Sequence, residues 1–318
     1  MRLGGSVRTC LDGNIVSEFQ GATQGVAPTS ALAWPMRLTA GIVVLLAVAA
    51  GIGAFVPGLY HDTPTINASD RGSDLLTLLL IVPALCASVA YSARGSLRAQ
   101  VVWLGLVSWV LYNYVVYLFG INFTPLFLVH VALVSLSLFT LLLVIRRTDV
   151  AGLRRQFSSS MPRRSIAGFL FVVAGMFAIL WLSDILPATF GGGNPARLRA
   201  LQITSNPVEV NDLGVIVPLL VLAGVWTWQR REVGYLMAGI LLAMATITMA
   251  ALVPGGPLFA QTAIDPVSIG VAALSLGFLV VLLARAHPDG GRFDEASRGR
   301  GRGTEVSDGR TYPAPLGA

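Results

Sequence analysis

Three polar residues lie inside two consecutive apolar runs, and their types are suited to binding a ligand. Asn113 and Tyr117 are four residues apart in the first run, which places them on one face of a helix. His130 lies in the next run, within a stretch free of charged residues. An unpaired polar group is costly to bury in hydrocarbon, so each of these residues needs a protein partner or a bound molecule.

Three aspartates lie at the ends of other apolar runs. Asp74 and Asp212 each open a run, and Asp184 lies just before the end of another. If these run ends share one membrane surface, their carboxylates can line one cavity with the three polar residues above. The candidate ligand-binding residues are Asn113, Tyr117, His130, Asp74, Asp184 and Asp212.

Each candidate also has a purely structural alternative. Tyrosines near a membrane surface, such as Tyr112 and Tyr114, commonly anchor a helix with the hydroxyl among the headgroups. An aspartate that opens a helix commonly caps it and complements the helix dipole. A hydrogen bond between Asn113 and His130 can simply join two helices. The sequence leaves these alternatives open.

Several chemistries lack the residues that they require. All 22 basic residues are Arg, so no Lys is present for a retinal or pyridoxal Schiff base. His130 is the one His within an apolar run, which excludes a haem held by two histidines of this chain. The HExxH, GxSxG and P-loop signatures are missing. We therefore predict no catalytic residue, no metal site and no cofactor, and an enzyme is the least favoured class.

The composition is typical of a protein embedded in lipid. Hydrophobic residues make up 54% of the chain and charged residues only 12%, about half of what a water-soluble surface carries. Mean hydropathy is +0.72. The arginines gather beside apolar runs, so the net charge of +6 reflects membrane topology, and we expect no nucleic-acid partner.

Eight apolar runs are near the roughly 20 residues that cross a hydrocarbon core as a helix. We therefore predict an all-α, polytopic transmembrane bundle of about eight helices. The predicted spans are Leu38–Val56, Leu75–Ala93, Val101–Gly120, Leu126–Ile145, Ile166–Leu186, Val215–Gln229, Tyr235–Val253 and Ile269–Ala284.

Arginine placement predicts the orientation. Positive residues concentrate in cytoplasmic loops, and alternate loops of this chain differ sharply in Arg content. This predicts that both termini are cytoplasmic. The predicted cytoplasmic arginines are Arg94, Arg98, Arg146, Arg147, Arg154, Arg155, Arg163, Arg164, Arg230, Arg231, Arg285 and Arg292, against Arg71, Arg197 and Arg199 outside.

The two halves of the chain share a pattern. Spans two and six follow Asp74 and Asp212, and contain Ile81-Val82-Pro83 and Ile216-Val217-Pro218. With an even number of spans per half, duplication predicts two parallel four-helix repeats. The chance resemblance of apolar helices is the alternative.

The expected organisation has five segments. Residues 1–35 form a disordered tail, or an extension upstream of a start at Met36, and cleavage of the first span stays possible. Residues 36–145 form the first half, 146–165 a basic cytoplasmic loop and 166–286 the second half. Residues 287–318, rich in Gly and Arg, form a disordered cytoplasmic tail.

The stretch Leu111-Tyr112-Asn113-Tyr114-Val115-Val116-Tyr117-Leu118-Phe119-Gly120, the Asn122-Phe123 pair and the helix from Phe127 to Phe139 resemble a family of bacterial multi-pass membrane proteins with no assigned activity. The stretch from Asp74 to Arg98 fits the same resemblance. It implies a bacterial cell membrane and brings no substrate or catalytic residue.

Two functions from different classes remain. The first is binding or transport of a small molecule or lipid group through an outward-facing polar cavity. The second is a scaffold or assembly subunit that contacts other membrane proteins, or itself, through small residues suited to close packing. Those residues are Gly41, Gly168, Gly175, Gly270 and Gly277. The lipid bilayer is the expected partner in both.

Overall fold

The computed structural model describes residues 29–148, 162–259 and 266–284, and every regular element in these residues is helical. The helices are α2 (Thr29–Phe55), α3 (Pro64–Leu76), η1 (Thr77–Ile81), α4 (Val82–Ala93), α5 (Leu97–Gly120), α6 (Phe127–Arg147), α8 (Arg163–Gly191), α9 (Ala196–Leu201), α10 (Pro207–Asn211), η2 (Asp212–Ile216), α11 (Val217–Trp228), α12 (Glu232–Phe259) and α13 (Pro266–Ala284).

Seven helical stretches of the described residues are long and apolar enough to cross a membrane. The prediction of an all-α polytopic bundle is confirmed. The eighth predicted span corresponds to α13, whose apolar part, Ile269–Ala284, is a shorter helix. This chain is therefore a multi-pass membrane protein.

Three spans begin eight to eleven residues before their apolar runs, at Thr29, Pro64 and Pro207. The second and sixth gain a polar turn because Thr63 and Asn206 accept hydrogen bonds from backbone N–H groups at the helix start. A proline follows each cap, where its missing N–H costs nothing. Periodic apolarity could not reveal the starts at Pro64 and Pro207, because most of the added residues are polar.

The first helix begins within the segment 1–35 that was predicted to be a disordered tail. Pro35 lies inside α2, and the hydroxyl of Thr39 donates to the Pro35 carbonyl at 2.8 Å. That part of the prediction is wrong, because α2 continues through Pro35, and a membrane helix tolerates a proline where neighbouring groups satisfy the freed backbone. Residues 1–28, residues 149–161 of the predicted basic loop, and the predicted tail 287–318 lie outside the described residues.

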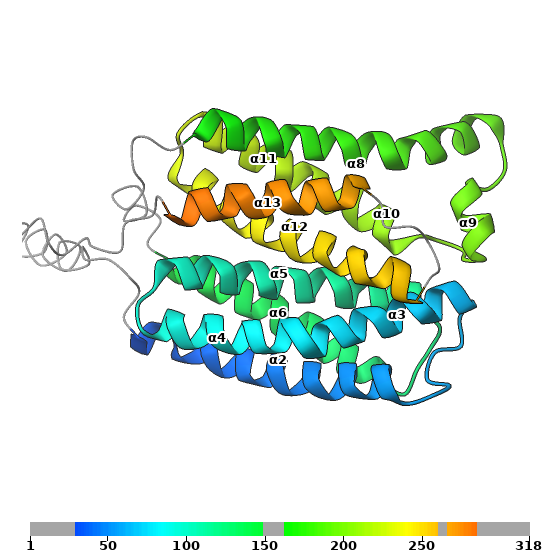
Figure 1. Cartoon of the computed structure of the whole chain (residues 1–318), viewed down its shortest axis with the longest axis horizontal. Coiled ribbons are helices and arrows are strands. Elements are labelled where there is room, and N and C mark those ends of the chain that lie inside the picture. Colours follow the sequence, from blue (N-terminus) through cyan, green and yellow to red (C-terminus); the bar gives the residue numbers. More distant parts are fainter. Residues whose placement is uncertain (1–28, 149–161, 260–265, 285–318) are drawn as a thin grey trace, which may run out of the picture.

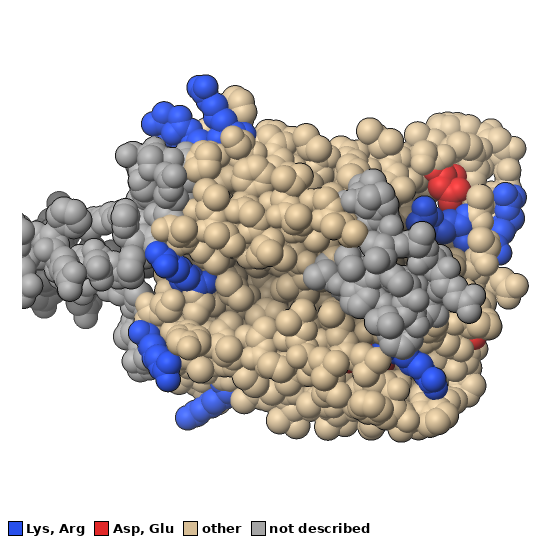
Figure 2. Space-filling model, viewed as in Figure 1, with Lys and Arg blue, Asp and Glu red and all other residues tan. Residues whose placement is uncertain are grey.

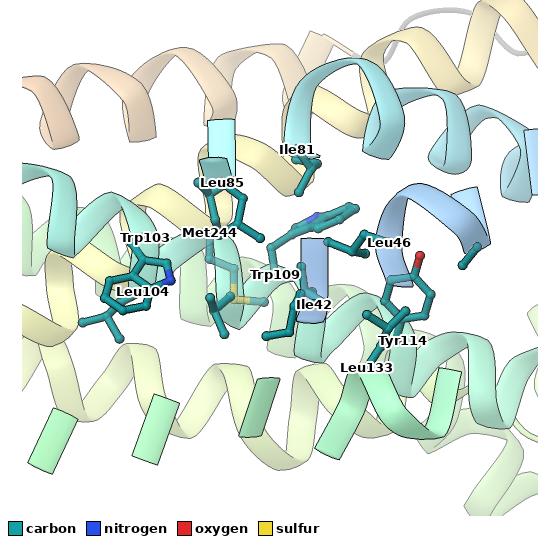
Figure 3. Close-up of a cluster of buried hydrophobic side chains, with 14 of the residues drawn as sticks. Ile42, Leu46, Ile81, Leu85, Trp103, Leu104, Trp109, Tyr114, Leu133 and Met244 are labelled. Carbon is teal, nitrogen blue, oxygen red and sulfur yellow. The ribbon is translucent and has the colours of Figure 1, made fainter. Parts of the chain in front are cut away.

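The helices pack around two apolar cores, one in each half of the chain. Figure 1 shows α2, α4, α5 and α6 on one side and α8, α11 and α13 on the other, with α12 between them. Figure 3 shows part of the first core, where Trp103 and Trp109 lie near Met244 of α12. A Cβ on Gly105 of α5 would overlap Ala243 of α12, so the two halves approach closely there.

A π-helical segment interrupts the second and sixth spans at matching places. The N–H of Val82 bonds to the carbonyl of Thr77, and the N–H of Val217 bonds to that of Asp212. In both, a proline follows directly, and the wider turn relieves the clash of its ring with the preceding turn. Counting back from Pro83 and Pro218, Thr77 stands where Asp212 does. Asp74 therefore matches Glu209 in this register. Duplication itself stays a prediction.

Charged side chains lie at the two ends of the bundle. Figure 2 shows arginines at both ends, acidic residues at one end, and an uncharged band between them. Figure 1 shows that α2 begins and α13 ends at the same end. The opposite end, which we call the polar end, carries the connections between α2 and α3, α5 and α6, and α8 and α10.

Candidate functional site

Asp74 is the centre of a buried polar network at the polar end. Its side chain is 2% exposed and lies on α3. The hydroxyl of Tyr60 donates to Oδ2 at 2.5 Å, and the hydroxyl of Tyr117 lies 3.4 Å from Oδ1. A Cβ on Gly53 of α2 would overlap this carboxylate. Asp74 is therefore enclosed by α2, α5 and the connection between α2 and α3.

Three rings extend this network from Tyr117 into α6. His130 is 2% exposed, and its ring lies 5.4 Å from that of Tyr117 and 5.3 Å from that of Tyr114, centroid to centroid. Tyr114 and Tyr117 are 5.4 Å apart. The Tyr114 hydroxyl is buried without a hydrogen-bond partner. His130 therefore faces α5 and the interior of the bundle.

A pocket reaches this network from the polar end. Its volume is about 130 Å³, and Tyr117 and His130 belong to its wall. The remaining lining residues come from the connection between α5 and α6 and its flanks. They are Leu118, Ile121, Asn122, Phe123, Thr124 and Phe127.

Tyr60 lies outside the membrane-spanning helices and acts as a hydrogen-bond donor. Burial raises the pKa of its phenol well above the ordinary value, and the nearby carboxylates of Asp74 and Asp70 raise it further. The phenol therefore stays protonated and keeps its hydrogen for Asp74. Asp70 adds a further polar atom, because its Oδ2 is buried without a hydrogen-bond partner.

Asp212 belongs to a separate network in the second half. It is 4% exposed, and it accepts hydrogen bonds from Tyr112 Oη and Trp181 Nε1, both at 2.9 Å. The guanidinium of Arg197 stacks 4.6 Å from the Trp181 ring centre and lies 3.9 Å from Glu209. Tyr112 and Tyr117 are five residues apart on one α-helix, so they point in different directions.

Asp184 has a structural role at the surface. Its two carboxylate oxygens accept the backbone N–H groups of Ala196 and Arg197, at 3.0 and 3.2 Å. These are the first residues of α9, whose exposed N–H groups need acceptors. The carboxylate therefore ties α9 to the end of α8.

The structure thus brings together three of the six predicted site residues, Asp74, Tyr117 and His130. Asp212 and Asp184 lie in the other arrangements just described. Asn113 is half-buried, and its side chain takes part in none of the side-chain hydrogen bonds among the described residues. One cavity lined by all six is not what the structure contains.

The structure also decides two of the alternatives left open by the sequence. Thr63 and Asn206 hold the N-cap positions, so Asp74 and Asp212 do not cap their helices. Tyr112 bonds to the buried Asp212 carboxylate, and Tyr114 is buried among other side chains, so neither hydroxyl lies at the surface of the bundle.

Sequence reasoning missed Tyr60 and Trp181. Tyr60 follows the turn after α2, and Trp181 lies within an apolar run where indole rings are common. The partners of both are 14 and 31 positions away, so no local pattern could reveal the contacts.

The arrangement can exchange protons or hydrogen bonds with a small polar species. Among the described residues, no three His, Cys, Asp or Glu side chains gather to hold a metal ion. Comparison with models of protein families, with curated proteins and with solved structures gives no match for this chain.

Proposed function

We propose that this membrane protein binds and transports a small polar solute through the pocket at its polar end. The observation that carries the proposal is the enclosed Asp74 carboxylate, joined by Tyr117 to a pocket wall that also contains His130. Buried polar groups are retained in membrane helices chiefly where they face a cavity or one another. Here they do both.

The size of the pocket limits the solute. A volume of about 130 Å³ holds roughly four water molecules at about 30 Å³ each. Pockets for drug-sized ligands measure about 300–1,000 Å³. Of the two ligands expected from the sequence, a small molecule of few heavy atoms fits better than a lipid group.

We infer further that the polar end faces the outside of a bacterial plasma membrane, with both termini in the cytoplasm. The short connections at the opposite end carry Arg94, Arg230 and Arg231, as the positive-inside rule requires of cytoplasmic loops. The polar end carries the acidic Asp62 and Asp184 together with fewer arginines. Membership of the bacterial family with no assigned activity is part of the same proposal.

Thiol labelling tests the proposal without knowledge of the solute. In a Cys10→Ser, Cys86→Ser background, Leu118→Cys places a thiol in the pocket wall. A small, membrane-impermeant methanethiosulfonate added to intact cells should modify it. Leu133→Cys in the solid core and Leu138→Cys on the exposed surface of α6, about three helical turns from its polar end, are the controls, and neither should react. An unreactive Leu118→Cys, or one that reacts only after permeabilisation, would contradict the proposal.

The scaffold function keeps one specific observation in its favour. A Cβ placed on Gly168 or Gly175 of α8 would meet no atom within 4 Å. These glycines are therefore not needed for packing within the chain and leave room for a neighbouring helix. Gly168→Cys should then form a disulfide-linked dimer under oxidation, or crosslink to a partner, if this surface is an interface. A monomer under the same oxidation would remove the scaffold alternative.

A further inference from the structure

The buried Asp74 carboxylate has no cationic side chain beside it among the described residues. A carboxylate buried away from water needs a cation or a proton. Among the described residues, no arginine forms an ion pair with Asp74 or Asp70. The groups that face Asp74 are an acid and three phenols: Asp70 on the same helix, Tyr60 before it, and Tyr114 and Tyr117 on α5. The imidazole of His130 on α6 lies behind the rings of Tyr114 and Tyr117. The described side chains of α12 carry no charge after Glu232, at its far end.

The hydrogen bonds of Tyr117 indicate where a proton belongs. Its hydroxyl lies 3.1 Å from the backbone carbonyl of Asp70 and 3.4 Å from Oδ1 of Asp74. One phenol has one hydrogen to donate, so it can satisfy only one of these acceptors. A proton on Asp74 Oδ1 resolves the conflict, because Oδ1 then donates to Tyr117 Oη while Tyr117 donates to the carbonyl.

The other carboxylate oxygen leaves little room for a metal cation. Oδ2 of Asp74 accepts from Tyr60 at 2.5 Å, and the backbone of Gly53 closes its other side. A cation such as Ca²⁺ takes six to eight oxygen ligands, and the Tyr60 hydrogen already points at this carboxylate. A proton needs no such space.

Resting on the proposed function, which supplies the pocket's access to the outer solution, we propose that Asp74 is a proton-binding site. The proton resides on Oδ1, is shared with Tyr117 Oη, and exchanges with the outer solution through the pocket. His130 lies beside Tyr117 in the pocket wall, and an imidazole can take a proton on one nitrogen and release one from the other. The Tyr114 hydroxyl, buried with no hydrogen-bond partner, is a further polar group beside this route.

Infrared difference spectroscopy on the full chain in liposomes tests the proposal. Spectra taken across a pH change should contain a carboxylic-acid C=O band that shifts in D₂O. Asp74→Asn should abolish this band. The matched control is Asp212→Asn, which should leave the band unchanged. Asp212 is also buried and accepts two hydrogen bonds, but none of its partners is a pocket residue. Retention of the unchanged band in Asp74→Asn would overturn the proposal.

Tyr117→Phe gives a second, independent reading. It removes the oxygen that shares the proton, so the band should persist at a shifted frequency because the acid loses its acceptor. A band at the wild-type frequency would show that Tyr117 does not share the proton. Size-exclusion elution establishes that each variant is folded.

Two further measurements test whether the bound cation is a proton or a metal ion, and whether the proton reaches Asp74 through the pocket. Sodium chloride at constant pH should leave the band unchanged relative to choline chloride, and loss of the band with sodium would identify a metal-cation site instead.

A bulky thiol adduct on Phe123→Cys, at the pocket, should slow deuterium exchange of the band. Unchanged exchange would overturn the pocket route. Failure of Leu118→Cys labelling with a normal Asp74 band would overturn only the proposed function.

Discussion

Tyr60 and Asp74 are joined by a hydrogen bond of 2.5 Å from the phenol to the carboxylate, across 14 positions of the chain. Tyr60 lies in the connection after α2, and Asp74 lies in the third helical turn of α3. The bond closes this connection over the carboxylate and helps to make the network inaccessible to lipid. Loss of this bond therefore lowers the free energy of unfolding and leaves Asp74 Oδ2 without its donor.

Tyr60→Phe should lower the free energy of unfolding by about 1–3 kcal/mol, because Asp74 Oδ2 is left without its donor. The effect depends on pH. Burial raises the folded-state pKa of Tyr60 above the unfolded value of about 10, so its contribution is complete below about pH 10 and is lost as pH rises further. Denaturant titrations from about pH 8 to about pH 11 measure this.

Tyr91→Phe, at an exposed tyrosine, is the control for this measurement. It should change neither the free energy of unfolding nor its dependence on pH. Equal loss of stability at high pH in wild type and Tyr60→Phe would show that Tyr60 does not titrate as the structure requires.

Gly53→Ala should destabilise the protein by about 1–3 kcal/mol, because the new methyl group overlaps the Asp74 carboxylate and lies 2.6 Å from the Tyr60 hydroxyl. Gly51→Ala, two residues earlier in α2, meets no atom within 4 Å and should be neutral or slightly stabilising. Thermal unfolding of both variants in detergent provides the comparison. Equal midpoints would contradict the close approach of α2 to Asp74.

Asp184→Ala should loosen α9, because two backbone N–H groups at its start lose their acceptor. Loss of such a carboxylate costs about 1 kcal/mol, which corresponds to roughly a fivefold rise in local opening. Trypsin cleavage after Arg199, measured by mass spectrometry, should accelerate accordingly. Ser183→Ala, which leaves Asp184 intact, is the control. Unchanged cleavage would mean that α9 is held by other contacts.

Reporter fusions test the orientation. Fusions after Arg155 and Arg292 should report the cytoplasm, and fusions near Asn67 and Gly192 should report the outside, because arginine-rich loops are retained in the cytoplasm. An external signal at Arg155 would overturn the assignment of both ends of the bundle.

The membrane-spanning helices and their alternation were predictable because each is a local property of the chain. A helix in hydrocarbon must satisfy its own backbone and present apolar side chains over roughly 20 residues. The helix starts were less predictable, since Thr63 and Asn206 cap polar turns that extend beyond the apolar runs. The contact of His130 with Tyr117 followed from two antiparallel helices joined by a short connection.

The partners of the carboxylates were decided only by tertiary structure. A helix carries side chains in every direction, and the sequence does not say which faces meet. Asp74 and Asp212 look alike as residues near the start of a span, yet one bonds to Tyr60 and Tyr117 and the other to Tyr112 and Trp181. The pocket beside Asp74 likewise depends on how α5 and α6 separate at the polar end. Such relationships arise because packing the apolar faces fixes the rotation of each helix, and the few polar side chains then meet whatever that rotation brings.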